Sequence, residues 1–131
     1  MEYQAMAVNL PKDQFLRAYL EAAEWAGLDE DGREALELAV APKWSAESIQ
    51  RARDECDDFQ QAYEGFLSVF YAHGHDPAQA GHDFYLSRNG HGAGFFDRGT
   101  HSVYALLQRA AKLWGPVSVE FDAETETLTT C

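Results

Sequence analysis

Side chains that could do chemistry are concentrated between residues 73 and 101. All the histidines of the chain lie in this segment: His73, His75, His82, His91 and His101. Three aspartates, Asp76, Asp83 and Asp97, lie among them. Imidazole and carboxylate groups bind Zn²⁺ and transfer protons. No spacing in the segment matches His-Glu-x-x-His or Cys-x-x-Cys, so we expect neither a metal ion nor another cofactor.

An acid–base site without a metal is the alternative use of this segment. His91, with a glycine on each side, would form a proton-transfer pair with Asp83 or Asp97. No nucleophile is evident, because Ser87 lies in Leu-Ser-Arg-Asn rather than in Gly-x-Ser-x-Gly. The candidate site residues are the polar ones of this stretch: His82, Asp83, Arg88, Asn89, His91, Asp97, Arg98 and His101.

Glycines at alternate positions, Gly90, Gly92 and Gly94, indicate a sharp turn or a close backbone approach. They do not form a dinucleotide-binding loop, because the third glycine follows the second too soon. No Lys-Ser or Lys-Thr follows, so the segment is not a Walker A loop either. We expect the turn to seat Phe95 and Phe96 in the hydrophobic core.

The polar residues around this turn also have a structural interpretation. Asp97 and Arg98 would pair with Arg88 and Asp83, or Asp97 would lie at the N-terminus of the next helix, where negative charge is favourable. Two further side chains would bond buried backbone groups: Asn89 and His91.

Helical spacing of apolar residues and capping residues place the chain in the α+β class, as one mainly helical domain over 1–131. The expected helices span 11–26, 33–40, 46–72, 77–88 and 100–114, and a C-terminal hairpin joins 117–122 to 126–130. Asp76-Pro77-Ala78-Gln79 is a strong helix start, which outweighs the alternative of a strand over 83–88. The hairpin must lie on the helices or pair with another strand for stability. Tyr3–Val8 is either an ordered arm or a short strand, and as a strand it would complete a small antiparallel sheet.

The longest expected helix carries a cluster of carboxylates opposite its apolar face: Asp54, Glu55, Asp57 and Asp58. Such a face is usually solvated surface. It can also imitate the phosphates of DNA and enter the basic groove of a nucleic-acid enzyme. Arg51 and Arg53 interrupt the stripe of negative charge.

The net charge of the chain is −12, from 22 acidic and 10 basic residues. This charge disfavours direct contact with nucleic acid or an anionic membrane surface, and it suits a protein partner with a basic surface. No apolar run is long enough for a transmembrane helix, and no secretory signal is visible. Cys56 and Cys131 do not make a disulfide framework, so we expect a soluble protein of a reducing compartment.

Residues 80–98 read Ala-Gly-His-Asp-Phe-Tyr-Leu-Ser-Arg-Asn-Gly-His-Gly-Ala-Gly-Phe-Phe-Asp-Arg. This segment resembles the signature of a family of small acidic proteins encoded by bacteriophages and related mobile elements, in which Trp often stands at the positions of Tyr85 and Phe96. Phe-Leu-Arg-Ala-Tyr-Leu-Glu-Ala-Ala near the start, followed by an acidic helix, fits the same family. The family has no settled activity, so the resemblance implies no catalytic roles. It implies an accessory protein in the cytoplasm of a bacterial host.

These observations predict a non-enzymatic accessory protein of a phage or mobile element that binds a host or phage protein. The expected target of such an acidic inhibitor is a host nucleic-acid-directed defence complex, of the restriction or CRISPR type. The alternative is a small hydrolase, metal-dependent or using a His/Asp pair, with its site in residues 82–101. A third alternative is a structural or regulatory phage protein that forms homo-oligomers.

Overall fold

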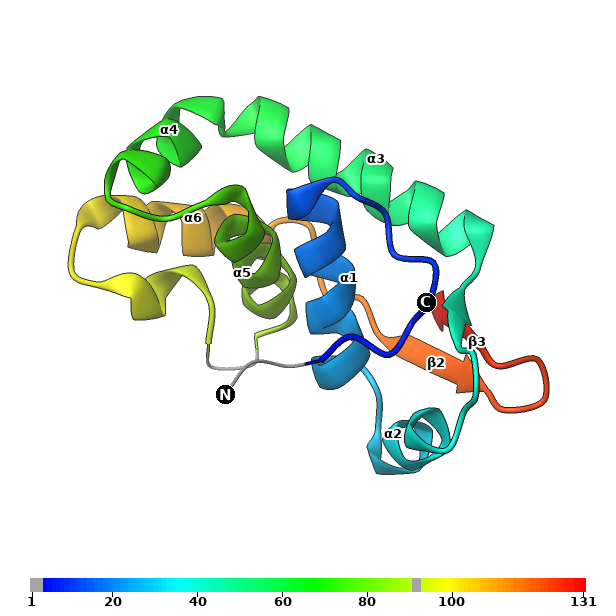
Figure 1. The fold of residues 1–131 in the computed structure, drawn as a ribbon. Helices are drawn as coiled ribbons and strands as arrows, with labels where there is room; N and C mark the ends of the chain where they lie inside the picture. The colour runs from blue at the N-terminus through cyan, green and yellow to red at the C-terminus, as the bar shows by residue number, and fades with distance from the viewer. Residues whose placement is uncertain (1–3, 91–92) are drawn as a thin grey trace.

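The computed structural model describes residues 4–90 and 93–131, and these confirm the α+β class (Figure 1). The helices of this part are α1 (Gln14–Ala26), α2 (Glu30–Glu37), α3 (Ala46–Ala62), α4 (Glu64–Ala72), α5 (Pro77–Asn89), the short 3₁₀ helix η1 (Phe95–Arg98) and α6 (Ser102–Lys112). The strands are β1 (Lys43–Trp44), β2 (Val119–Asp122) and β3 (Thr127–Thr130). None of the helices described is long and apolar enough to cross a membrane.

Ser45 and Asp76 begin α3 and α5 where the sequence predicts, and each accepts a hydrogen bond from the backbone N–H three residues ahead. α1 begins at Gln14 rather than at residue 11, because Asp13 caps it by accepting a hydrogen bond from the Leu16 N–H. α5 starts with Pro77 and ends at Gly90, which has the left-handed φ of 67° that favours glycine. The predicted fourth helix is therefore confirmed, and the alternative strand in its place is wrong.

α2 begins earlier than expected, at Glu30 rather than at residue 33. The Oδ1 atom of Asp29 accepts a hydrogen bond from the Gly32 N–H at 2.7 Å. This capping bond turns the acidic segment Asp29–Gly32 into the first turn of the helix.

The longest expected helix is two helices, α3 and α4, with a break at Tyr63. Tyr63 has φ −121° and ψ 30°, outside the helical region. Its ring packs on Phe59 at 5.3 Å and on Trp114 at 5.8 Å between centroids. Because the break redirects α4 onto α6, Leu67 and Phe70 are buried.

The sheet has the strand order β1-β3-β2. β2 and β3 form the predicted C-terminal hairpin, with Phe121 opposite Leu128. β1 runs parallel to β3 and pairs Lys43 with Thr127 and Trp44 with Leu128. The sheet is therefore mixed, with two residues before α3 as its third strand.

The N-terminal arm lies beside β1 without forming a strand, so the expected strand over Tyr3–Val8 is wrong. Tyr3 itself lies outside the described residues. The side-chain amide of Asn9 accepts a hydrogen bond from the Trp44 N–H and donates one to the Trp44 C=O, each at 2.9 Å. The arm was expected to pair with the hairpin; β1 takes that place instead, and the Asn9 side chain bonds its outer edge.

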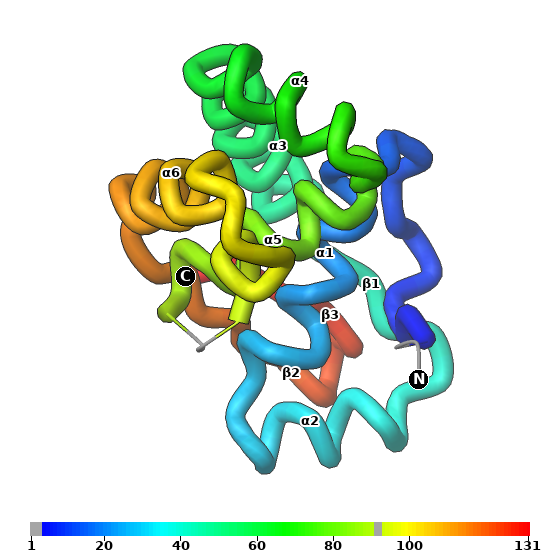
Figure 2. Tube along the Cα trace, turned by 90° about the vertical axis from the view of Figure 1, so that its left-hand side faces the viewer, coloured from blue at the N-terminus to red at the C-terminus, as the bar shows by residue number. Residues whose placement is uncertain are grey.

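α5 is the central helix of the helical part, between α1 and α6 (Figure 2). The ring of Phe84 stacks on Phe59 of α3, with centroids 4.2 Å apart. α1 and α5 approach so closely at Gly81 that a Cβ there would collide with the backbone carbonyl of Phe15. Glycine at this position therefore sets the distance between the two helices.

Candidate functional site

The motif segment, which we define as residues 80–98, lies mainly inside the protein. α5 contributes these buried residues: Ala80, Gly81, Asp83, Phe84, Tyr85, Leu86, Ser87 and Arg88. A polar group in such a position is costly unless it is hydrogen-bonded. Within the described part of the chain, no buried side-chain nitrogen or oxygen lacks a hydrogen-bond partner. The polar residues of α5 are therefore used by the protein itself.

Arg88 is a buried cross-link between four parts of the chain. Its guanidinium donates to the C=O groups of Gly115 and Trp114 at 2.7 and 2.9 Å. It also donates to the hydroxyl of Tyr19 at 3.0 Å and to the carboxylate of Glu55 at 3.1 Å. Burial raises the pKa of Tyr19, so its hydroxyl keeps its proton while it accepts this bond. Arg88 is not available to a ligand, and its expected pairing with Asp97 is wrong.

Asp83 forms the predicted ion pair with Arg98. Its side chain is 1% exposed, and its two oxygens accept from Nε and Nη2 of Arg98 at 2.8 Å each. The hydrogen bond to this carboxylate raises the pKa of Arg98. The ring of His82, partly exposed, places Nδ1 at 3.4 Å from Asp83 Oδ1 and lies beside the ring of Trp25. The structure thus brings three candidate residues together: His82, Asp83 and Arg98.

The turn after α5 seats one phenylalanine in the core instead of two. Phe95 is fully buried, whereas Phe96 is 43% exposed. The two residues belong to η1, in which consecutive side chains point in different directions, so only one of them faces the core. Gly94, with φ 129°, approaches Ser87 so closely that a Cβ would collide with its Oγ. That Oγ accepts a hydrogen bond from the Phe95 N–H at 3.1 Å.

Asn89 bonds backbone groups, as expected. Its Nδ2 donates to the Tyr85 C=O at 2.8 Å, and its Oδ1 accepts from the Val117 N–H at 2.9 Å. Asn89 therefore fastens the end of α5 to the segment that leads into β2. The matching prediction for His91 lies outside the described residues, as does Gly92.

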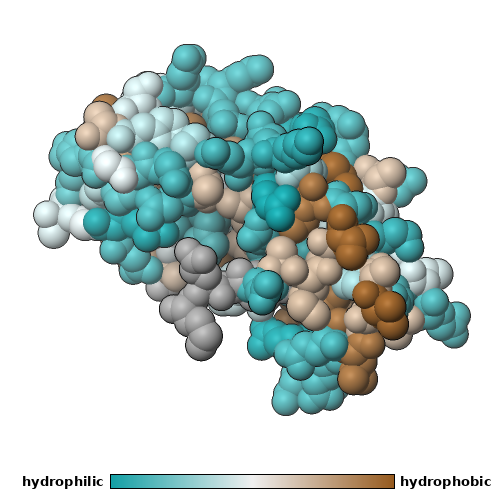
Figure 3. All heavy atoms as spheres, viewed as in Figure 1, coloured by the Kyte–Doolittle hydropathy of each residue, from teal (hydrophilic) through white to brown (hydrophobic). Residues whose placement is uncertain are grey.

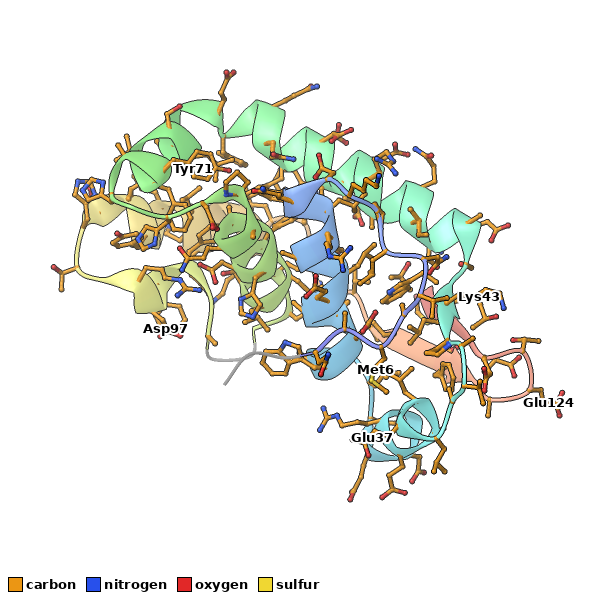
Figure 4. The ribbon with its side chains drawn as sticks, viewed as in Figure 1. Met6, Glu37, Lys43, Tyr71, Asp97 and Glu124 are labelled. Atoms are coloured by element: carbon orange, nitrogen blue, oxygen red, sulfur yellow. The ribbon has the colours of Figure 1, made fainter. Side chains whose placement is uncertain are left out.

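Asp97 neither pairs with Arg88 nor caps α6. It is exposed on the outer side of η1 (Figure 4). The cap of α6 is His101, whose Nδ1 accepts a hydrogen bond from the Val103 N–H at 3.0 Å. The expected cap is wrong because Gly99 and Thr100 place Asp97 outside the first turn of α6.

Three histidines gather at the other end of α5, around Tyr104. His75 accepts or donates at both ring nitrogens: Nε2 lies 2.9 Å from the Tyr104 hydroxyl and Nδ1 lies 2.8 Å from Gln79 Oε1. The exposed rings of His73 and His101 lie 4.5 Å apart. Among residues 4–90 and 93–131, no group of three or more His, Cys, Asp or Glu is arranged to hold a metal ion.

The acidic face of α3 consists of exposed carboxylates, with one exception. Asp54, Asp57 and Asp58 are exposed, and hydrophilic side chains cover this side of the molecule (Figure 3). Glu55 turns inward, because it receives the hydrogen bond from Arg88. We therefore define the acidic face as Asp54, Asp57 and Asp58.

An apolar patch lies at the opposite end of the molecule, where the N-terminal arm meets the segment before β1. Val8, Leu38 and Val40 are 67%, 85% and 91% exposed, and Figure 3 shows hydrophobic atoms gathered at this end. The Val8 N–H donates to the Pro42 C=O at 2.8 Å. The carboxylate of Glu126 accepts from the N–H groups of Val40 and Ala41 at 3.0 and 2.9 Å. These bonds hold the backbone while the aliphatic side chains point outward.

Glu24 is a buried carboxylate that the sequence analysis did not single out. It accepts hydrogen bonds from Met6 N–H, Ala7 N–H and the indole N–H of Trp44. Its position on the buried side of α1, among apolar residues, is the signal that helical spacing offers for such a residue. It joins the N-terminal arm to α1 and β1.

No protein-family model, curated protein or solved structure matches the chain. Its function is therefore inferred from its own residues.

Proposed function

We propose that this protein acts by binding another protein, with the acidic face of α3 as its contact for a basic surface. The observation that supports this proposal most is the contrast in exposure. Two charged residues of α5 in the motif segment, Asp83 and Arg88, are hydrogen-bonded inside the protein, whereas Asp54, Asp57 and Asp58 of α3 are exposed. The exposed aliphatic patch at the other end of the molecule also favours a contact with protein.

The carboxylates would act by occupying a groove that holds the phosphates of DNA or RNA. Such complementarity steers association and competes directly with the nucleic acid. The resemblance of the motif segment to phage-encoded proteins suggests the setting: a bacterial cytoplasm, with a host nucleic-acid-directed defence complex as the target. The proposed role is therefore that of an acidic inhibitor of the anti-restriction or anti-CRISPR type.

A charge-reversal capture experiment tests this function. The double variant Asp57→Lys/Asp58→Lys should lose the host protein that the wild-type chain captures from a bacterial lysate. Its matched control, Glu34→Lys/Glu37→Lys, changes the same charge on the exposed side of α2 and should retain it. Added DNA should also release the captured protein. Equal capture by both variants, with DNA having no effect, would remove the acidic face from the mechanism.

Acid–base catalysis at His82 is a second candidate, because one geometric observation favours it. The buried carboxylate of Asp83 lies 3.4 Å from His82 Nδ1 and would orient the ring, leaving Nε2 free for proton transfer. If His82 acts in this way, the protein should hydrolyse at least one substrate when a set of esters and phosphoesters is assayed. His82→Ala would abolish that hydrolysis without unfolding the chain.

A further inference from the structure

β2 is an edge strand whose outer side carries open backbone groups. The Val119 N–H points away from β3 and donates to the Gly27 C=O at 3.2 Å. Because backbone groups alternate in direction along a strand, the N–H and C=O of Phe121 also point away from β3. Within the described residues, no other backbone segment is hydrogen-bonded to Phe121 on that side. Such an edge is a template for another extended chain.

A hollow of about 360 Å³ separates this edge from α2. Figure 1 shows the two elements side by side, at the end of the molecule away from α4. Leu28, Ala35 and the half-buried Phe121 give the hollow an apolar lining. Asp29 and Asp31, both exposed, add two carboxylates to it.

A second hollow lies over the outer face of the hairpin, and two carboxylate residues are among those that line it. Glu120 and Phe121 line both hollows, and Asp122, Thr127 and Thr129 line this one. Successive side chains of a strand point to opposite faces of a sheet. A strand added beside β2 would therefore direct one set of side chains to the apolar residues of the hollow beside α2. The alternate set would lie near Glu120 and Asp122 on the outer face of the hairpin.

We propose that the outer edge of β2 binds an extended peptide segment of a partner protein in which aliphatic residues alternate with lysine or arginine. The peptide backbone would bond the N–H and C=O of Phe121, as in other cases of strand addition. Its aliphatic side chains would enter the hollow beside α2, and its cationic side chains would lie near Glu120 and Asp122. This surface is separate from the acidic face of α3, so the inference goes beyond the proposed function.

A second copy of the chain is a poor occupant of the same edge. Two β2 strands side by side, each reading Val-Glu-Phe-Asp, would bring Glu120 and Asp122 close to the same carboxylates of the other copy. Like charges facing each other across a sheet are destabilising. Charge complementarity therefore favours a basic peptide over self-association.

Amide NMR on the isotope-labelled full chain tests this inference with two synthetic peptides, acetyl-Lys-Val-Lys-Val-Lys-amide and acetyl-Glu-Val-Glu-Val-Glu-amide. The lysine peptide should cause saturable shifts of the Phe121 and Gly32 signals and should slow hydrogen exchange at the Phe121 N–H. The glutamate peptide should cause neither change. If millimolar lysine peptide leaves these two signals in place, the inference is overturned.

A charge-reversal variant distinguishes binding at the edge of β2 from non-specific attraction of a cationic peptide to an acidic protein. Glu120 is exposed and no side-chain hydrogen bond holds it within the described residues, so Glu120→Lys should fold. Reversing this one exposed charge should weaken the lysine peptide about fivefold, and the variant should now bind the glutamate peptide. Asp57→Lys/Asp58→Lys should bind the lysine peptide as the wild type does. Equal weakening in both variants would overturn the inference while leaving the proposed function of α3 untouched.

Discussion

The motif segment and the acidic face of α3 are both rich in charge, yet the fold uses them in opposite ways. On α5, Asp83 and Arg88 face inward and bond to protein groups. On α3, Asp57 and Asp58 face solvent. The difference lies in the burial of the two helices, because α3 buries one side and exposes the other, whereas polar and apolar residues of α5 are buried alike.

This contrast teaches how to judge a cluster of polar residues in a sequence. A charged residue on a helix that is buried on most sides must find a partner inside the protein, since an isolated buried charge is very costly. A charged residue opposite an apolar stripe remains available to other molecules. The residue composition of residues 80–98 suggests a site, whereas the burial of α5 gives its charged residues a structural role.

Replacing Arg88 should produce the largest effect. Arg88→Ala leaves Glu55, Tyr19 and two backbone carbonyls without their donor, which should lower the free energy of unfolding by about 3–5 kcal/mol. Urea denaturation measures this loss. The control is Arg17→Ala, which removes an exposed pair with Glu21 and should cost less than about 1 kcal/mol. Similar losses in both variants would contradict the inward role of Arg88.

Gly81→Ala should have the next largest effect. Its methyl group would meet the backbone of Phe15, and overpacking of this kind costs about 1–3 kcal/mol. Thermal unfolding should show a lower Tm. The control is Gly65→Ala in α4, where no atom lies near the new methyl group, and this change should stabilise by about 0.5–1 kcal/mol. If Gly81→Ala leaves the Tm unchanged, the backbones of α1 and α5 are not in close contact at this position.

Asn89→Ala should have an intermediate effect. It leaves the Val117 N–H without its partner, at a cost of about 1–3 kcal/mol, and hydrogen exchange at that N–H should accelerate. Gln50→Ala on α3 removes an exposed hydrogen bond to Asp54 and should change stability by less than about 0.5 kcal/mol. Unchanged protection of Val117 in Asn89→Ala would be the contrary outcome.

The smallest effect on stability is expected for the acidic face itself. Asp57→Ala/Asp58→Ala removes two exposed charges and should change the free energy of unfolding by no more than about 0.5 kcal/mol. The same variant should nevertheless capture less of its protein partner. A large loss of stability would show that these carboxylates, like Asp83, serve the fold.

Local signals predicted the elements that are capped or turned by their own residues. The capping residues Asp76 and Gly90 predict the two ends of α5. Alternation of apolar and polar residues around Phe121 predicts the hairpin. The predicted pairing of Asp83 with Arg98 was also confirmed, because the two residues lie close along the chain on either side of a glycine turn.

Features that depend on distant partners were not predicted. The role of Arg88 needs Tyr19, Glu55 and Gly115, which belong to three other segments. The strand Lys43–Trp44 is too short to show an alternation of apolar and polar residues. The sequence therefore indicates the N-terminal arm, rather than these two residues, as the third strand of the sheet. The break at Tyr63 also lacks a proline, and only the ring contacts of the folded protein explain it.

The parallel pairing of β1 with β3 has a consequence for the order of folding. Lys43 pairs with Thr127, which lies far along the chain, and the hydrogen bonds that the Val40 and Ala41 N–H groups donate to the Glu126 carboxylate span 86 and 85 positions. Contacts between neighbouring helices form early, whereas closing so large a ring carries an entropic penalty that delays it. We therefore expect the sheet to assemble last and to open first under mild denaturant, with α5 and α6, which are neighbours in the chain, still packed together.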